Sequence, residues 1–463
     1  MSIRAFVVAT LFCLVASQLA TAQEKSDQSF AEAFAGDAKK MYSHVVELVD
    51  EAEVEAEREA DEESPDVVSV YENTTVTIKA DRSYSETVHQ VSFVSSRAGI
   101  ETASALSRRW TPWYQNKPEI TARVISPRGS EAWLDASTLA EASFGEVDYG
   151  IYTDDRAMEG VLPNVRRGSV IEKVFRVDQS RPFCEAGVIY QRSLYRYQRP
   201  IEWKLTFIFP KSLPFKYMVA GDQEVRETRT EQGDNIVVEL TIDQENEKDG
   251  DGVDKGRTFE VNAGPDTYQF PKIVVSTQDS WGPITDYYHS QIEEVMSGQD
   301  YNQFVETLDT QGMDSDAIVS EVLAIVQDRV RYTGFEFGIR AIIPNDSKVV
   351  WERGLGDCKD QSTLMVGILR KLGVDAHVAL LKSGYGVDLA SDHPGLNAFN
   401  HVIVYIPGEK PYWVDPTATF YPAGTLPVAD TNRYALIIKP GNDQLVKIPR
   451  AKKTRTGRQQ NES

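Results

Sequence analysis

The stretch Gly354–Asp360, with the sequence GLGDCKD, carries the strongest structural signal in this chain of 463 residues. Its two glycines allow a tight turn into the start of a helix. Asp357 is a favourable N-cap, because its carboxylate can accept hydrogen bonds from the free amides of the first turn. Cys358 is thereby predicted at the first helical position, where amides and helix dipole stabilise a thiolate and a developing oxyanion. A lone cysteine is, however, more often a small buried apolar residue.

The segment around this stretch predicts an α+β domain over residues 275–435. The helix that begins there runs over Asp357–Leu372 and is followed by Gly373, a residue favoured just beyond helix ends. Apolar residues at helical spacing predict another helix over Ser315–Val330. The long polar connection Lys382–Asn397 is of a length that is often functional. Strands are predicted at Ala376–Leu381, Phe399–Ile406 and Tyr412–Asp415.

A nucleophilic thiol needs a base, and His401 is the best-placed candidate. It lies in a strongly β-forming run, where the default role of a histidine is that of a satisfied core residue. The turn Pro407–Pro411 joins this run to the next strand. If the hairpin is symmetric about Gly408, His401 faces Asp415 at about 5 Å, which lets a carboxylate orient an imidazole. A slip of one residue would place the two on opposite faces.

The N-terminal half has a different pattern, with alternating polar and apolar residues in short runs. This alternation predicts half-buried antiparallel strands separated by polar turns, and an all-β sandwich-like domain over residues 66–270. No catalytic constellation is found there. The clearest runs are Val67–Tyr71, Thr75–Lys79, Ser85–Val88, Ile171–Phe175, Trp203–Ile208 and Ile236–Leu240.

Three motifs of the C-terminal half resemble the core motifs of the transglutaminase-like superfamily: GDCKD at 356–360, NHV at 400–402 and WVDPT at 413–417. The β-rich domain before them resembles, more loosely, the uncharacterised exported module that often precedes such cores in bacterial proteins. The resemblance covers residues 66–445. Many relatives continue into a further β-rich region, so the C-terminus of this sequence is a candidate truncation.

The resemblance implies a papain-like fold in which Cys358 is the nucleophile, His401 the general base and acid, and Asp415 its orienting partner. The family also uses an upstream side chain to hold the oxyanion, and Tyr332 is the candidate here. A tyrosine at that position is otherwise a core residue. No cofactor is implied. Cys358, His393 and His401 lack the spacing of a metal site, so none is predicted.

The first 22 residues predict a secretory signal peptide. Arg4 precedes a short apolar run, and Ala20–Ala22 is a small-x-small cleavage pattern. An uncleaved anchor is the alternative. Residues 23–65 form an acidic segment whose helical part, 28–63, carries an apolar stripe before a linker, and residues 436–463 are predicted as a polar tail. The stripe consists of Phe30, Phe34, Met41, Val45 and Leu48.

Composition narrows the functional classes. The net charge of −21 argues against general binding of nucleic acids, which requires basic patches on the protein surface. Only Cys184 and Cys358 remain after cleavage, so at most one disulfide can form. No later segment is apolar enough to span a membrane. Because residues 1–22 predict a signal peptide, the expected location is periplasmic or extracellular.

Two functions remain open at this level. One is a cysteine enzyme that attacks an amide of a protein or peptide, a cell-envelope peptide among the candidates, and forms a thioester. The acyl group then passes to water, as in a peptidase or amidase, or to an amine, as in a transglutaminase. The other is a binding or assembly module that keeps the fold without turnover.

The signal peptide leads to a direct prediction. Cleavage after Ala22 should give a mature chain that begins at Gln23. Edman sequencing or intact-mass measurement of the protein recovered from the periplasm or medium checks this. Recovery only as the full-length chain in the cytoplasm would contradict it.

Overall fold

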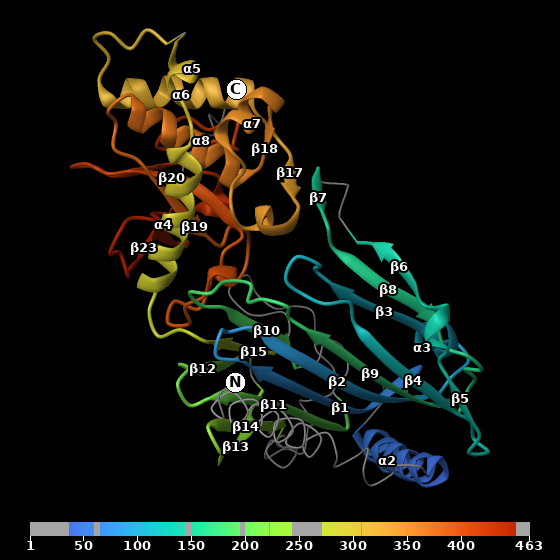
Figure 1. Cartoon of the computed structure of the whole chain (residues 1–463). Coiled ribbons are helices and arrows are strands. Elements are labelled where there is room, and N and C mark those ends of the chain that lie inside the picture. The colour runs from blue at the N-terminus through green and yellow to red at the C-terminus, as the bar shows by residue number, and fades with distance from the viewer. Residues whose placement is uncertain are drawn as a thin grey trace, which may run out of the picture.

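The computed structural model describes residues 37–59, 65–144, 150–194, 200–221, 223–242, 271–306 and 308–450. A β-rich part precedes a mixed part in which helices surround a smaller sheet (Figure 1). The predicted β-rich character of the N-terminal half is thus confirmed. The predicted signal peptide at 1–22 lies outside the described residues. Among the described residues, no helix is both long and apolar enough to cross a membrane.

An eight-stranded sheet forms the framework of the N-terminal part. Its strands, in spatial order, are β13 (Val225–Gln232), β14 (Asn235–Ile242), β11 (Glu202–Pro210), β1 (Val67–Ile78), β2 (Tyr84–Val94), β9 (Val170–Asp178), β4 (Glu119–Ile125) and β5 (Glu131–Trp133). The pairs are antiparallel except for β1 with β11, which run parallel. The prediction of purely antiparallel strands is therefore wrong at the centre of the sheet.

Strand β1 is also longer than the sequence indicated. The polar residues between Val67–Tyr71 and Thr75–Lys79 were expected to form a turn, but β1 runs through them. Asn73 and Thr74 are buried because β2 and β11 flank the strand on both sides. The central position in the sheet thus overrides the local turn preference of polar residues.

Different layers cover the two faces of the large sheet. Val88 and Val91 of β2 point to opposite faces of the sheet, and each belongs to a different cluster of buried apolar side chains. Helix α2 (Ala38–Glu59) covers one face, with Met41 and Val45 of the predicted stripe buried. Small three-stranded sheets pack on the other face: β10 (Ile189–Ser193), β15 (Lys272–Ser276) and β12 (Lys216–Ala220), and β3 (Ala105–Trp110), β8 (Arg156–Val161) and β6 (Ala140–Ser143).

The C-terminal part holds a five-stranded antiparallel sheet. Its strands, in spatial order, are β21 (Tyr412–Val414), β20 (His401–Ile406), β19 (His377–Leu381), β22 (Tyr434–Ile437) and β23 (Leu445–Lys447). Residues 436–450, which the sequence placed in a polar tail, instead include the end of β22 and all of β23. The helices are α4 (Gly282–Ser297), α5 (Asn302–Val305), α6 (Ser315–Arg329), α7 (Ser347–Arg353) and α8 (Cys358–Lys371).

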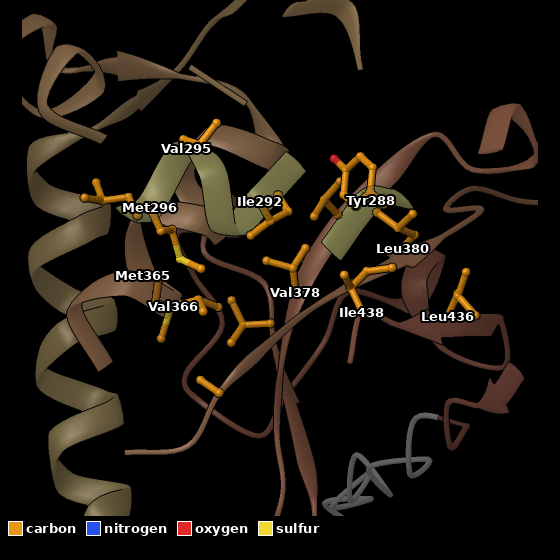
Figure 2. Packing of buried hydrophobic residues seen from close by; sticks show 14 of the residues in the cluster. Tyr288, Ile292, Val295, Met296, Met365, Val366, Val378, Leu380, Leu436 and Ile438 are labelled. Atoms are coloured by element: carbon orange, nitrogen blue, oxygen red, sulfur yellow. The ribbon is translucent and has the colours of Figure 1, made fainter. Parts of the chain in front are cut away.

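Helix α8 is the centre of this part. Every residue from Lys359 to Leu369 is buried, because α6, α4 and the sheet all pack against the helix. Figure 2 shows side chains of α4 and α8 meeting those of β19 and β22 in one cluster. The predicted helices at 315–330 and 357–372 are confirmed, and Gly373 takes the expected left-handed conformation with φ 81°.

The loop before β20 fixes the two parts to each other. The side-chain amide of Asn397 accepts a hydrogen bond from the backbone N–H of Ile189 at 2.6 Å and donates one to its carbonyl at 2.5 Å. Asn397 thereby bonds to β10 as a neighbouring strand would. Gly395 packs so closely there that a Cβ atom would lie 2.5 Å from the Ile189 side chain and 2.7 Å from its backbone nitrogen.

A second contact between the two parts lies near the start of α8. Strand β7 (Ile151–Thr153) comes from the N-terminal part and pairs in parallel with β17 (Gly334–Glu336). Tyr152 stacks on Phe335 with ring centroids 5.6 Å apart. Figure 1 shows β7 extending from β6 and β8 towards β17. The β-rich part therefore supports a strand whose Glu336 contacts the site described below.

We predict that Gly395→Ala weakens the join between the two parts. Replacing glycine by alanine usually stabilises by up to about 1 kcal/mol through the unfolded chain, but overpacking a rigid backbone contact costs about 1–3 kcal/mol. The steric cost should win, giving a lower free energy of unfolding by urea. Gly298→Ala is the matched control, because nothing lies within 4 Å of its Cβ position and its φ is −81°. Equal stability of the two variants would contradict the prediction.

Candidate functional site

The turn before α8 needs both of its glycines. Gly354 has φ 65°, a conformation that residues with a Cβ rarely adopt. Gly356 ends β18 (Leu355–Gly356), and a Cβ there would lie 2.9 Å from Val350 and 3.0 Å from Asp360. Asp357, fully buried, then caps the helix as predicted. Its carboxylate accepts hydrogen bonds from the amides of Lys359 and Asp360, both at 3.1 Å, so the cap does not use the amide of Cys358.

A buried ion cluster, which the sequence did not reveal, holds this turn. The ammonium of Lys359 donates to the capping carboxylate of Asp357 and lies 3.7 Å from Glu336 on β17. Burial opposes the charge on Lys359, but the carboxylates of Asp357 and Glu336 outweigh it and raise the pKa of the lysine. The residue directly after Cys358 is therefore a fixed cation.

The structure brings Cys358, His401 and Asp415 together. Cys358 is half-buried at the first position of α8, and its sulfur lies close enough to His401, at the start of β20, to raise the pKa of the imidazole. His401 Nε2 lies 3.1 Å from Asp415 Oδ2. Thr417 fixes the other carboxylate oxygen through its backbone N–H at 2.9 Å and its hydroxyl at 2.7 Å. The structure thus groups a thiol, an imidazole and a carboxylate, with the imidazole bonded to the carboxylate.

This grouping favours a charged imidazole. Burial opposes the charge, but the hydrogen bonds to Asp415 and Cys358 outweigh it and hold the pKa of His401 well above its ordinary value. Burial likewise opposes the charge on Asp415, but the hydrogen bond from His401 and those from Thr417 hold its pKa below its ordinary value. At neutral pH the two side chains therefore form an imidazolium–carboxylate pair.

The hairpin that joins His401 to Asp415 corrects one assumption. Its register pairs Tyr405 with Trp413 and Val404 with Val414, so the turn is centred on Glu409 rather than Gly408. Prolines stand at both ends of the five-residue turn and have no N–H to give to a strand ladder. The position that faces His401 on the next strand is therefore shifted by two residues. An even shift keeps Asp415 on the same face of the sheet as His401, diagonal to it.

Tyr332, the candidate oxyanion side chain, lies beside the cysteine. It belongs to β16 (Arg331–Tyr332) and pairs with Gly356 on β18. The residue is 44 % exposed. Burial of the phenol and then the negative charges at Cys358 and Asp357 raise its pKa, so the hydroxyl keeps its proton and can donate a hydrogen bond. The catalytic role of Tyr332 stays a prediction.

A shallow cleft of about 380 Å³ opens beside His401 and Asp415. Asp430 and Ser383 also line it, and the sequence singled out neither residue. One oxygen from each of Asp415 and Asp430 and one ring nitrogen of His401 lie within 4.8 Å of one another, and this is the one group of possible metal ligands among the described residues. His393, which the metal hypothesis would require, pairs instead with Asp392.

The fold described above recurs in a solved structure. A candidate protease from Parabacteroides distasonis aligns over 83 % of this chain and 72 % of its own with a TM-score of 0.61 and 12 % sequence identity. At that identity the likeness shows a shared fold alone. A domain family of unknown function with a solved structure, DUF3857, matches residues 80–246. No protein among those with curated functions matches the chain.

Two further solved structures have low TM-scores and do not establish a shared fold. An M1 zinc metallopeptidase from Deinococcus radiodurans covers 46 % of this chain and 42 % of its own, with a TM-score of 0.24 and 11 % identity. A protein described as a TGase covers 46 % and 51 %, with a TM-score of 0.17 and 11 % identity.

The paired charges predict a pH window of stability. The lowered pKa of Asp415 stabilises the fold above its ordinary value near 3.9, and that gain is lost as the pH falls. The raised pKa of His401 stabilises the fold below its ordinary value near 6.5, and that gain is lost as the pH rises through the raised value. Asp415→Asn should thus reduce the free energy of unfolding most between about pH 4 and 6.5, by about 1–3 kcal/mol. Urea titrations across pH check this, and a difference that grows below pH 4 would contradict it.

Proposed function

We propose that this protein is an exported, cysteine-dependent amide hydrolase or acyl transferase with a transglutaminase-like, papain-like core. The observation that carries the proposal is the grouping of Cys358, His401 and Asp415 at the start of α8, where His401 bonds to Asp415 and the Cys358 sulfur raises the pKa of the imidazole. The fold shared with a candidate protease supports an activity of this general kind. The signal-like N-terminus supports export.

The side chains define the order of steps. The Cys358 thiolate attacks the carbonyl carbon of a substrate amide, and the carbonyl electrons move to its oxygen. The imidazolium of His401 then gives its proton to the amide nitrogen as the C–N bond breaks, leaving a thioester and a free amine. The now neutral His401 takes a proton from water, whose oxygen attacks the thioester and releases the acid. Asp415 keeps the imidazole oriented throughout.

Two donors are available for the negative oxygen of the tetrahedral intermediate. The amide of Cys358 lies at the helix N-terminus and is left out of the Asp357 cap. The phenol of Tyr332 stands on the adjacent strand and keeps its proton. Donors aimed at a developing oxyanion stabilise the transition state more than the substrate.

Hydrolysis is the favoured outcome for the acyl group. The cleft beside His401 and Asp415 is open, so water reaches the site without a conformational change. A polypeptide or a cell-envelope peptide is the proposed substrate, because the structural neighbour is a candidate protease and export would bring the enzyme to such chains. Transfer to an amine requires an acceptor that binds well enough to compete with water.

A binding or assembly module is the second candidate. It would retain the fold and could retain the arrangement of the three side chains, but it would release no product. Measured turnover separates the two functions, since covalent labelling of Cys358 alone would occur in both.

The triad should act as a unit. We predict that Cys358→Ala and His401→Ala each lower amide hydrolysis by about 10²- to 10⁴-fold, and that the double variant is hardly worse. Asp415→Asn should lower the rate while Cys358 still reacts with iodoacetamide. The measurement is release of a fluorophore from a quenched peptide library, with amine incorporation followed in parallel.

Cys184→Ala is the matched control for the thiol. Burial raises the pKa of Cys184 to about 11, so this thiol should neither label at neutral pH nor affect turnover. Circular dichroism must show that each variant is folded. Full activity in Asp415→Asn, with another acidic residue proving essential, would place the third member of the triad elsewhere.

A further inference from the structure

A second carboxyl group lies behind the proposed triad. Asp430 ends the short 3₁₀ turn Val428–Asp430 and is only 2 % exposed. Its Oδ1 accepts a hydrogen bond from the hydroxyl of Ser383 at 2.5 Å. Carboxyl oxygens of Asp430 and Asp415 lie within 4.8 Å of each other and of a ring nitrogen of His401. The site therefore holds two neighbouring acids in a buried setting.

The two carboxyl groups differ in how many of their oxygens have hydrogen-bond partners. Asp415 already accepts from Thr417 at Oδ1 and bonds to His401 at Oδ2. Oδ2 of Asp430 is buried and has no hydrogen-bond partner among the described residues. Two bare carboxylates in such a place would repel each other and lose their hydration. A proton on one of the two acids, or a bound cation, would relieve this repulsion.

The geometry favours the proton. A divalent cation held by this set would need imidazole nitrogen and carboxylate oxygen each at about 2.0–2.2 Å. His401 Nε2 and Asp415 Oδ2 bond directly to each other at 3.1 Å, and this hydrogen bond accounts for both atoms without a cation. The imidazolium already neutralises the charge of Asp415. Asp430 is the remaining acid, and a proton on its Oδ2 turns an unpartnered acceptor into a donor.

We propose that Asp430 is a positioning residue, whose neutral carboxyl group donates a hydrogen bond to Asp415. The effect of Asp430 on catalysis rests on the proposed function, whereas the protonation of its carboxyl group does not. In support, burial together with the charge of Asp415 raises the pKa of Asp430 against the opposing effects of His401 and Ser383. The titratable groups that act on it most strongly are His401 on β20 and Asp415 after β21.

The backbone around Asp430 is fixed from the histidine side. Asn400, the residue before His401, accepts from the backbone N–H of Ser383 at 2.8 Å and donates to its carbonyl at 3.0 Å. Ser383 in turn holds Asp430. A proton donated to Asp415 adds to the bonds from Thr417 and helps to hold the carboxylate in the orientation that bonds to His401. The imidazolium of His401 is thereby kept in place beside Cys358.

Infrared spectroscopy tests the protonation state without requiring activity. The difference spectrum between the full-length wild type and Asp430→Asn at pH 7 should show the C=O stretching band of a protonated carboxyl group in the wild type. Asp443→Asn, at an exposed position, should show only carboxylate bands and serves as the control. A carboxylate band alone in the Asp430 difference spectrum would overturn the proposal, whatever the protein's catalytic function.

Two substitutions test the positioning role through the reactivity of Cys358. Asp430→Leu removes both polar oxygens, and losing a hydrogen bond to a charged group should slow iodoacetamide labelling about tenfold at pH 7. Asp430→Asn keeps the shape and an N–H donor, so it should recover labelling to within about threefold of wild type. Circular dichroism and thermal unfolding check the fold, and equal damage by both substitutions would overturn the role.

A metal is the remaining outcome to separate. Wild-type protein should label equally with and without EDTA, and elemental analysis should find no stoichiometric metal that Asp430→Asn lacks. One bound equivalent of a divalent metal that is lost in Asp430→Asn would overturn the proposal and assign a cation site to this group. Normal labelling and infrared results with no amide turnover on any substrate would instead sink the proposed function and leave the protonated acid standing.

Discussion

Asp357 is completely buried at the first turn of α8, where the free amides of the helix would otherwise lose their hydrogen bonds to water. Because α4, α6 and the sheet enclose the helix, solvent cannot satisfy these amides, and the protein must supply internal partners. The capping carboxylate then needs its own countercharge, which Lys359 supplies, and Glu336 shares that lysine. Cys358 lies between Asp357 and Lys359 in the sequence, so these buried contacts on both sides restrict its movement.

The same reasoning connects the β-rich part to the site. Glu336 lies on β17, and β17 is paired with β7 from the N-terminal part. On the other side, Asn397 binds β10 a few residues before His401. The two elements that carry Cys358 and His401 are therefore each braced by strands from the first half of the chain. This supports a structural role for the β-rich part in shaping the site, in addition to any contact with substrate.

Local signals in the sequence were sufficient for some elements and insufficient for others. The helix that begins at Cys358 was predicted with nearly correct bounds because its cap, glycines and C-terminal Gly373 all lie close in sequence. The hairpin register was predicted wrongly, because the prolines at both ends of the turn make it five residues long and centre it on Glu409. The shift is an even number of residues, so His401 and Asp415 still lie on one face. Asp430 could not be found, since only the fold brings residues 383, 401 and 430 together.

The parallel pair β1–β11 and the Asn397 contact have a consequence for how the chain acquires its structure. Asn397 and Ile189 are 208 positions apart in sequence, and β1 pairs with a strand more than a hundred residues later. Closing such loops costs entropy before any contact repays it, so folding of this protein should be slow for its size and highly cooperative near the join. Until β7 is in place, the edge of β17 that it covers remains exposed to other chains. Expression of the C-terminal part by itself would leave that edge without its partner strand and would favour aggregation.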